Sequence, residues 1–471
     1  MHGCAKIEAM KLYNSLTRKV EDFSPLNTEM VTMYTCGPTV YDYAHIGNFR
    51  TYTLSDFINR ALLFNGNRVK FIMNLTDVGH MTGDNLGDAD TGEDRIEKSV
   101  AREGRTATEI STYYAQKFIQ DYDKMNFIRP EKFTKATEYI EEQIRLVKIL
   151  EEKGFTYTTS DGVYFDTSKF ESYGQLSGYT TDNVMEGARV EINPEKKHPT
   201  DFALWKFSPV DVKRSQEWPS PWGTGFPGWH LECSAMSLAE LGNTLDIHVG
   251  GEDLRMTHHQ NEIAQSESAT GKKFVRYWVH GAHMMVDGGR MGKSLGNAYT
   301  LTDIEKKGFD PMVLRYFFMT SNYRSKLNFT WDALQSAQNA LRRLYELARG
   351  YKKEDSAKAS KDFLKKFGDK VNDDLNMPEA LAVVWEMIKS ELEEPEKLAT
   401  LLKMDSVLGL KIEEHLAYDT PQKVLDVAKM RSEYRKAGIW DKADLARKQI
   451  LEMGYEVEDL PDGKFKIKRK M

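Results

Sequence analysis

One stretch near the N-terminus restricts the folds open to this chain more than any other. Residues 30–36 are a β-branched run that ends at a Gly-Pro pair, which is typical of a buried strand. Apolar residues then recur at helical spacing from Leu54 to Leu62, and Asn65-Gly66 ends that helix. Residues 68–75 predict a second strand. Strand, helix and strand within about 45 residues make a βαβ unit, so the sequence predicts an α/β fold around a parallel sheet.

This alternation is interrupted once and then resumes. Residues 121–205 hold a charged helical stretch, a short strand at 162–166 and a run with several glycines, which predicts an insertion between two halves of the sheet. The pattern resumes with strands at 245–249 and 277–280 and a helical run between them. From about residue 331 the chain is rich in Leu, Lys and Glu at helical spacing, which predicts a helical bundle followed by a small end module.

Composition narrows the class of protein. The chain has 471 residues, enough for about three domains, and 40% of them are hydrophobic. It has no apolar run of about 18 residues and no apolar segment of a secretory signal, so we expect no membrane span and no export. Its three cysteines, Cys4, Cys36 and Cys233, are too few and too far apart for a disulfide framework. These features predict a globular, cytoplasmic protein.

The loop after the first predicted strand carries the first of three motifs. It reads Cys36-Gly37-Pro38-Thr39-Val40-Tyr41-Asp42-Tyr43-Ala44-His45-Ile46-Gly47-Asn48. Open parallel sheets bind ligands at this position, and the N-terminus of the following helix favours phosphate. His45 and Asn48 add hydrogen-bond donors beside it. Taken alone, a His-x-Gly-Asn tetrad also occurs in loops that have no such role.

A second set of residues has the chemistry of a metal site. His258 and Glu262 are four residues apart, so they share one face of a helix. With Cys36 and Cys233 they offer two thiolates, an imidazole and a carboxylate, a donor set that suits tetrahedral zinc. The spacing includes no Cys-x-x-Cys pair. On spacing alone, buried structural cysteines therefore remain an alternative interpretation.

Residues 288–297 form the third motif, which reads Gly-Gly-Arg-Met-Gly-Lys-Ser-Leu-Gly-Asn. A glycine-rich basic loop of this kind suits a mobile clamp on polyphosphate, with Lys293 as the point charge. The spacing of the glycines to Lys293 is not that of a P-loop. An ordinary surface loop remains the alternative for this motif taken alone.

Together and in this order, the motifs resemble those of the cysteinyl-tRNA synthetases, a family of class I aminoacyl-tRNA synthetases. The resemblance includes Gly-Trp-His-Leu-Glu-Cys-Ser-Ala-Met at 228–236 and extends from Lys11 to the C-terminus. All four candidate zinc donors and Lys293 are present, so we interpret the departures from the family pattern as variation and not as loss of activity. These departures are Asn48, Val249, Gln260, Arg290, Gly292 and residues 77–80.

The resemblance implies a fold and a division of the chain. The implied fold is a Rossmann-like parallel-sheet catalytic domain with an insertion, followed by an α-helical bundle and a small C-terminal module. The implied parts are a catalytic domain in two halves at 1–120 and 206–280, a connective insertion at 121–205, a stem-contact region with the Arg-Met-Gly-Lys-Ser loop at 281–330, a tRNA-binding bundle at 331–415 and an anticodon-binding module at 416–471.

The resemblance also implies a reaction. ATP, with Mg²⁺, would activate L-cysteine as cysteinyl-adenylate, and the cysteinyl group would pass to the 3′ end of tRNA(Cys). The implied protein is a monomer in which one zinc ion recognises the cysteine. Because the net charge is −6, an RNA partner would need locally concentrated positive charge.

Individual residues receive roles from the same resemblance. For Trp440, packing between helices fits the sequence as well as contact with the anticodon does. The implied residues are His45, Asn48 and Lys293 for catalysis; the same three with Gly251 and Asp253 for ATP and the adenylate; Thr39, Thr76 and Trp229 for cysteine; Cys36, Cys233, His258 and Glu262 for zinc; and Arg435, Trp440, Asp444 and Asp459 for the anticodon.

Two other functions stay open at this point. A ligase that activates cysteine and passes it to an amino-sugar would share the zinc and ATP motifs, but the helical region after Trp331 favours tRNA. A catalytically inactive relative that only binds RNA or cysteine is the second alternative. The substituted Arg290-Met291-Gly292 favours it, whereas the retained Lys293 and zinc donors do not.

Overall fold

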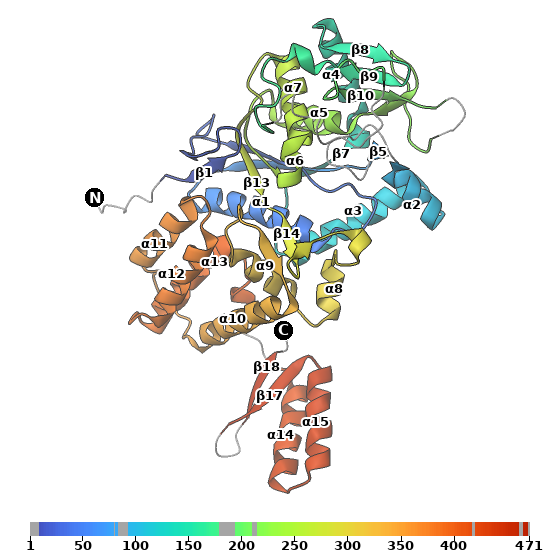
Figure 1. Ribbon diagram of the computed structural model, residues 1–471. Coiled ribbons are helices and arrows are strands. Elements are labelled where there is room, and N and C mark those ends of the chain that lie inside the picture. The colour runs from blue at the N-terminus through green and yellow to red at the C-terminus, as the bar shows by residue number, and fades with distance from the viewer. Residues whose placement is uncertain are drawn as a thin grey trace.

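Five parallel strands form the central sheet of the molecule (Figure 1). The computed structural model describes residues 9–79, 81–82, 93–178, 194–209, 214–416, 420–460 and 465–469, and Cys4 lies outside them. The strand order is β13-β12-β3-β4-β7, and each neighbouring pair is parallel. The predicted α/β class is therefore confirmed. The strands are β3 (Val31–Thr35), β4 (Val69–Leu75), β7 (Lys132–Lys135), β12 (Leu245–Gly251) and β13 (Val275–Gly281).

The two faces of this sheet pack against different helices. In β3, Met33 belongs to the core shared with α1 (Ile46–Phe64) and the helical bundle, whereas Tyr34 belongs to the core beneath α5 (Trp229–Leu241) and α7 (His258–Thr270). Successive side chains of a strand point to opposite faces, so both faces of the sheet are covered. This explains why the strands read as continuous apolar runs in the sequence.

A second, antiparallel sheet lies above the central one in Figure 1, with the order β11-β10-β9-β8. Its strands span 156–227, so β11 lies beyond the expected end of the insertion at 205. At the other boundary, β7 belongs to the central sheet although it lies within 121–205. The domain limits themselves stay a prediction. The strands and the adjoining helix are β8 (Thr156–Thr159), β9 (Gly162–Phe165), β10 (Phe202–Phe207), β11 (Gly225–Pro227) and α4 (Ile140–Glu152).

The remaining elements surround these two sheets. The N-terminal hairpin is β1 (Lys11–Asn14) and β2 (Lys19–Asp22), and the segment between β4 and β7 holds β5 (Met81–Thr82), β6 (Glu93–Asp94), α2 (Arg95–Glu103) and α3 (Ala107–Lys124). After β12 come α6 (Glu252–Met256), β14 (Met284–Val286), β15 (Gly289–Arg290), α8 (Leu301–Lys306), α9 (Pro311–Met319) and β16 (Leu327–Phe329). The helical bundle is α10 (Trp331–Gly350), α11 (Lys361–Asn372), α12 (Met377–Lys389) and α13 (Glu394–Leu408).

The C-terminal module has a core of its own. Figure 1 shows it below the bundle, where α14 (Gln422–Lys436) and α15 (Trp440–Glu452) pack on the hairpin of β17 (Tyr455–Asp459) and β18 (Phe465–Arg469). Its buried apolar residues form a cluster separate from the main core. An ion pair between Arg342 of α10 and Glu456 of β17 connects the module to the bundle.

A buried ionic network joins α1 to the helical region. Asp56 of α1 accepts hydrogen bonds from Arg315 Nη2 of α9 at 2.5 Å and from Arg60 Nε at 2.7 Å. Arg315 also donates to the carbonyl of Leu408 at the end of α13. Asp56 and Arg315 are both fully buried. The helix that begins at the first motif is therefore fixed to the bundle by charged groups removed from water.

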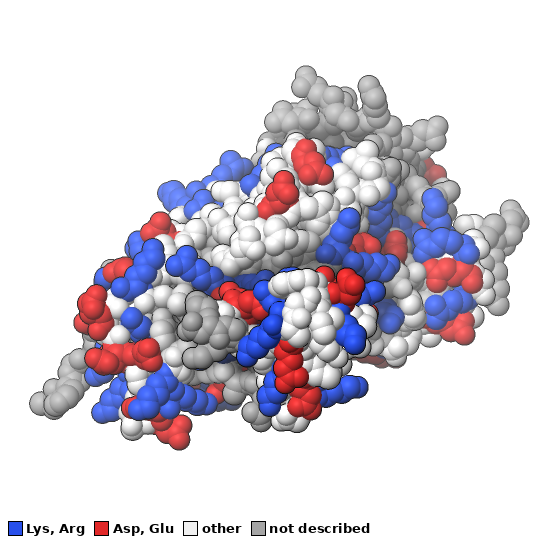
Figure 2. Space-filling model, turned by 90° about the horizontal axis from the view of Figure 1, so that it is seen from below, with Lys and Arg blue, Asp and Glu red and all other residues white. Residues whose placement is uncertain are grey.

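Charge on the surface is mixed. Figure 2 shows the molecule from below, and on this face Lys and Arg side chains are interspersed with Asp and Glu. This agrees with the small negative net charge of −6. Within the described part of the chain, no helix has the length and apolar character needed to cross a bilayer.

Candidate functional site

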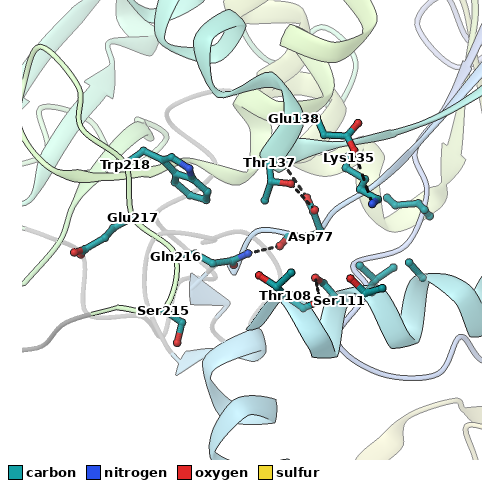
Figure 3. A pocket seen from close by; sticks show the side chains of 14 residues that line it. Asp77, Thr108, Ser111, Lys135, Thr137, Glu138, Ser215, Gln216, Glu217 and Trp218 are labelled. Carbon is teal, nitrogen blue, oxygen red and sulfur yellow. Dashed lines mark hydrogen bonds and ion pairs between the residues drawn. The ribbon is translucent and has the colours of Figure 1, made fainter. Parts of the chain in front are cut away.

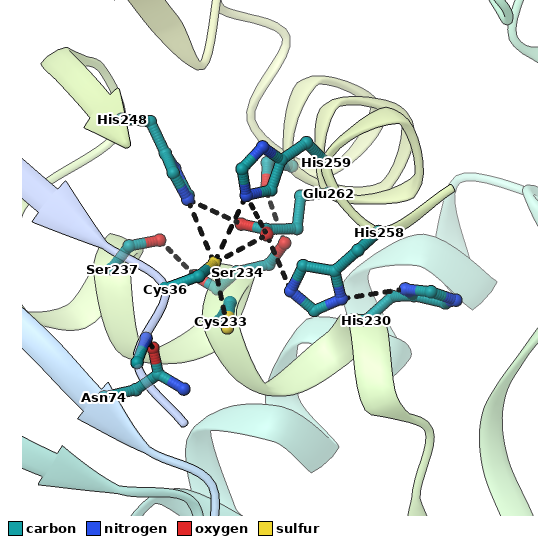
Figure 4. A network of polar contacts seen from close by, with 12 residues as sticks. Cys36, Asn74, His230, Cys233, Ser234, Ser237, His248, His258, His259 and Glu262 are labelled. Atoms are coloured by element: carbon teal, nitrogen blue, oxygen red, sulfur yellow. Dashed lines mark hydrogen bonds and ion pairs between the residues drawn. The ribbon is translucent and has the colours of Figure 1, made fainter. Parts of the chain in front are cut away.

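The four candidate metal donors converge where the two halves of the central sheet meet (Figure 4). Cys36 directly follows β3, and its N–H donates to the carbonyl of Val249 in the neighbouring strand β12. Cys233 lies in the second turn of α5, while His258 and Glu262 lie one turn apart in α7. All four side chains are buried. The contact between β3 and β12 and the packing of α5 on α7 thus bring together residues that are far apart in sequence.

The distances between the donor atoms suit a tetrahedral ion. Cys36 Sγ lies 3.7 Å from Cys233 Sγ and 3.6 Å from Glu262 Oε1. His258 Nε2 lies 3.0 Å from Glu262 Oε1. Ligands bound to zinc at about 2.0–2.3 Å in a tetrahedron lie about 3.3–3.8 Å apart. The two sulfur distances fall in that range and the nitrogen–oxygen distance is slightly shorter, so the donors already have nearly the required spacing.

The charges of this group also favour a cation. Burial, together with Cys233 and Glu262, raises the pKa of the Cys36 thiol well above its ordinary value. Burial opposes the imidazolium form of His258, but the neighbouring Cys233 and Glu262 outweigh it and raise the pKa of His258 to about 10. Glu262 Oε2 accepts no hydrogen bond from any described residue. The buried carboxylate and thiols therefore favour a positive charge beside them, which the imidazolium of His258 supplies here and a divalent cation would supply in its place.

A second donor set overlaps the first. His248 Nε2 and His259 Nε2 lie 3.4 Å and 3.3 Å from Cys36 Sγ, so these histidines could hold a metal with Cys36 and Glu262. No pattern in the sequence singled out these two histidines, although His259 directly follows His258. His248 Nδ1 has no hydrogen-bond partner among the described residues. Metal-binding histidines usually donate their other ring N–H, so the set with Cys233 and His258 is the better supported.

The other nitrogen of His258 does have a partner. His258 Nδ1 lies 3.1 Å from His230 Nδ1 in α5, and the ring of Trp229 lies 4.5 Å from the ring of His258. These contacts fix the plane of the imidazole and point Nε2 at Glu262. Trp229, expected near the cysteine, therefore lies against a candidate metal ligand.

His45 and Asn48 cap the N-terminus of α1. The N–H of Asn48 donates to His45 Nδ1, and the N–H of His45 donates to Asn48 Oδ1, which makes a reciprocal capping box. Since Nδ1 accepts, the proton of neutral His45 lies on Nε2. Burial and the nearby Lys293 lower the pKa of His45 to about 4, so the ring is neutral at physiological pH. The two residues are thus held at a helix N-terminus, where phosphate binds favourably.

The loop of the third motif packs on the first motif. The N–H of Ile46 donates to the carbonyl of Tyr299, and a Cβ on Gly47 would meet Met291 Sδ at 3.2 Å. Lys293 Nζ lies 2.9 Å from Asp42 Oδ2 in the first motif. The structure therefore brings Lys293 to the same end of α1 as His45 and Asn48. Asp42 received no role from the sequence, because its partner is 251 residues away.

A polar pocket opens next to the residues expected to line the cysteine. Thr39 and Thr76 form a bridge between the loops after β3 and β4. The residues that follow them, Val40 and Asp77, line a pocket of about 320 Å³, and Asp77 accepts hydrogen bonds from Thr137 (Figure 3). Its lining includes several hydroxyl side chains and Trp218. Thr39 and Thr76 are thus next in sequence to residues that line this pocket, without lining it themselves.

Gly251 and Asp253 lie where β12 passes into α6. Gly251 is the N-cap residue of that helix, and a Cβ on it would meet Asp253 Oδ1 at 2.4 Å and Thr51 Oγ1 of α1 at 3.7 Å. Asp253 itself is exposed. This backbone lies against α1, so Gly251 and the capped end of α1 lie at the same edge of the sheet.

The four residues expected at the anticodon all belong to the C-terminal module. Asp459 forms ion pairs with Arg435 and with Arg431, at 2.7 Å to Arg431 Nη1. The Arg435 guanidinium lies 5.7 Å from the ring of Trp440, whose side chain is 59% exposed. Asp444 is exposed one turn further along α15. Trp440 is therefore largely exposed at the start of α15, and its contact with the anticodon stays a prediction.

Known proteins resemble this chain over almost its whole length. Residues 22–339 match the family described as the catalytic domain of class I (C) tRNA synthetases. Cysteine–tRNA ligase 1 of Burkholderia lata is 44% identical, and the match covers 96% of each chain. The cysteine–tRNA ligase of Chlorobaculum tepidum is 39% identical over 98% of this chain and 100% of its own. Among solved structures, Mycobacterium tuberculosis methionyl-tRNA synthetase bound by methionyl-adenylate has a TM-score of 0.55 at 14% identity, covering 85% of this chain and 94% of that one, which shows a shared fold.

Proposed function

The chain belongs to the cysteinyl-tRNA synthetase family of class I aminoacyl-tRNA synthetases and is an enzyme of the cysteine–tRNA ligase type; from that premise we propose how its residues carry out the reaction. ATP and L-cysteine react to give cysteinyl-adenylate and pyrophosphate. The cysteinyl group then passes to the 3′ end of tRNA(Cys) with release of AMP. The enzyme acts as a monomer in the cytoplasm.

Activation depends on alignment and on charge at the phosphates. The carboxylate of cysteine is already ionised at neutral pH, so its attack on the α-phosphate needs no strong base. His45 Nε2–H, the side-chain amide of Asn48 and the ammonium of Lys293 donate to the phosphates, and Mg²⁺ accompanies the nucleotide. Gly251 allows close approach of the adenylate, and Asp253 binds it near the ribose.

Selection of cysteine over serine depends on the buried donor cluster. Cys36, Cys233, His258 and Glu262 hold one zinc ion. When bound, zinc supplies a soft Lewis acid that prefers a thiolate to a hydroxyl. Thr39, Thr76 and Trp229 orient the amino acid beside these ligands. A pocket that relied on shape alone would separate such similar substrates only by about 100-fold.

The helical bundle and the C-terminal module bind the tRNA. Arg435, Trp440, Asp444 and Asp459 present an exposed aromatic ring and charged groups, which is what bases in a single-stranded RNA loop require. The parts of the chain at 281–330, 331–415 and 416–471 would then contact the acceptor stem, the tRNA body and the anticodon in that order. Residues 1–120 with 206–280 carry the chemistry, and 121–205 forms the connective insertion.

The buried Cys36–Cys233–His258–Glu262 cluster supports this proposal most strongly. The test is ATP–pyrophosphate exchange with cysteine and with serine on zinc-replete protein, followed by charging of tRNA(Cys). We expect exchange with cysteine only and then stable charging. Exchange without charging would favour transfer to an amino-sugar, and absence of exchange would favour an inactive binding protein.

A further inference from the structure

The ion pair between Asp42 and Lys293 joins the first motif to the third. Lys293 Nζ lies 2.9 Å from Asp42 Oδ2 and 4.8 Å from the centre of the Tyr41 ring. The two side chains are 46% and 27% exposed, so solvent and ligands reach both. Lys293, the residue proposed to bind the phosphates of ATP, thus already has a carboxylate partner within the protein.

The backbone around Lys293 is held in the same place by other contacts. His45 of the first motif forms a bridge with Thr300, three residues beyond the third motif. Asn297 accepts a hydrogen bond from the N–H of Gly292 at 2.8 Å and donates to the carbonyl of Arg290 at 3.0 Å. Asn297 therefore ties together the two positions at which this loop departs from the family pattern. The loop is fixed at both ends, and the Lys293 side chain extends from it toward Asp42.

We propose that Asp42 is a positioning residue, which holds the Lys293 ammonium at the end of α1 until the phosphates of ATP replace the carboxylate. The ammonium group of lysine is a compact charge with no fixed donor geometry, so it can pair with a carboxylate or with a phosphate. A half-exposed ion pair contributes little free energy, so a polyphosphate of higher charge displaces it easily. This inference rests on the proposed role of Lys293 in ATP binding.

A purely structural ion pair would not couple Asp42 to ATP. If Asp42 and ATP compete for one ammonium group, removing the carboxylate charge must strengthen ATP binding, and only while Lys293 is present. Asp42→Asn is the suitable change, because Asp42 Oδ1 accepts a hydrogen bond from the N–H of Tyr43 at 2.8 Å and an asparagine oxygen keeps that bond. Direct repulsion between Asp42 and ATP would instead act with or without Lys293.

The test is a double-mutant cycle on the Kd of Mg·ATP, measured by isothermal titration calorimetry on the full chain. We expect Asp42→Asn to lower the Kd about two- to fivefold in the wild-type background and to leave it unchanged in the Lys293→Ala background. Glu386→Gln is the control, because Glu386 forms a comparable ion pair with Lys366 on the bundle at 2.7 Å, with a side chain that is 54% exposed. It should leave the Kd unchanged.

Two results would overturn the inference. One is an unchanged Kd in Asp42→Asn; the other is an equal change in both backgrounds. A wild-type protein that binds no Mg·ATP would instead contradict the proposed function as a whole. If Asp42→Asn unfolds, Tyr41→Leu is a second test. Loss of the ring beside the Lys293 ammonium should weaken the contacts that hold Lys293 near Asp42 and so also strengthen ATP binding. An unchanged Kd in Tyr41→Leu would count against the inference.

Discussion

His258 and His248 lie on opposite sides of Cys36, and the partners of their second ring nitrogens distinguish them. His258 Nδ1 faces His230, whereas His248 Nδ1 has no hydrogen-bond partner among the described residues. A neutral histidine that binds a metal through Nε2 carries its proton on Nδ1, and burying that N–H without an acceptor is costly. Burial lowers the pKa of His248 to about 4, so this ring stays neutral without any metal.

We therefore predict that His258→Gln and His248→Gln differ in zinc affinity. His258→Gln should weaken zinc binding by at least about 100-fold, because a direct ligand contributes more than the outer contacts whose loss costs about 10–100-fold. His248→Gln should stay within about tenfold of the wild type. Competition with a chromogenic chelator measures both. The reverse order would assign the metal to the set of Cys36, His248, His259 and Glu262.

At the scale of elements, α1 combines a structural cap with a chemical role. Asn48 Oδ1 accepts the N–H of His45, and this bond satisfies a backbone donor that the helix itself leaves free. The family pattern has a histidine at this position, so the substitution keeps a polar side chain at the start of the helix. The two residues of the cap are consequently also the proposed phosphate donors.

Two substitutions at Asn48 should separate these roles. Asn48→Ala removes the side-chain half of the capping box, the bond from the N–H of His45 to Asn48 Oδ1, and should lower the free energy of unfolding by about 0.5–1.5 kcal/mol. Asn48→Asp keeps an acceptor at the N-terminus of the helix and should retain that stability, but its negative charge should weaken ATP binding. Urea unfolding and the Kd of Mg·ATP measure the two effects. Equal stability of both variants would show that the bond made by the Asn48 side chain contributes nothing.

The sequence predicted those elements whose signals are local. The strands β3, β4, β12 and β13 and the helices α1 and α7 follow from apolar runs and helical spacing. The place of β7 in the central sheet was not predicted, because Lys132–Lys135 is short and carries two charged residues, so nothing in it indicates a buried parallel strand. The donor cluster was predicted through the family resemblance, while the Asp42–Lys293 contact depends on a long-range approach that no local pattern records.

At the scale of the whole molecule, one continuous core joins the sheet to the helical bundle. Buried residues of α1, α9, α10 and α13 belong to the same cluster, and the Asp56–Arg315 pair lies within it. Arg315 also donates to the carbonyl of Met125, which follows α3. Three segments of the chain therefore depend on one guanidinium group.

Loss of Arg315 should accordingly affect the whole fold. Arg315→Met leaves Asp56 buried beside fewer donors, and we expect the free energy of unfolding to fall by about 3–5 kcal/mol. The control Lys366→Met breaks the exposed pair with Glu386 and should cost less than about 1 kcal/mol. Urea unfolding followed by tryptophan fluorescence measures both. A loss below about 1 kcal/mol for Arg315→Met would mean that packing alone holds the bundle to the sheet.

The donors of the cluster lie on both sides of the insertion, and this has a consequence for the newly made chain. Cys36 and Cys233 are 197 residues apart, and His258 and Glu262 come later still. A nascent chain that has reached only Gly251 carries two of the four donors. An ion held by all four donors would therefore not be retained early in translation, and its capture would require the second half of the sheet to have closed on the first.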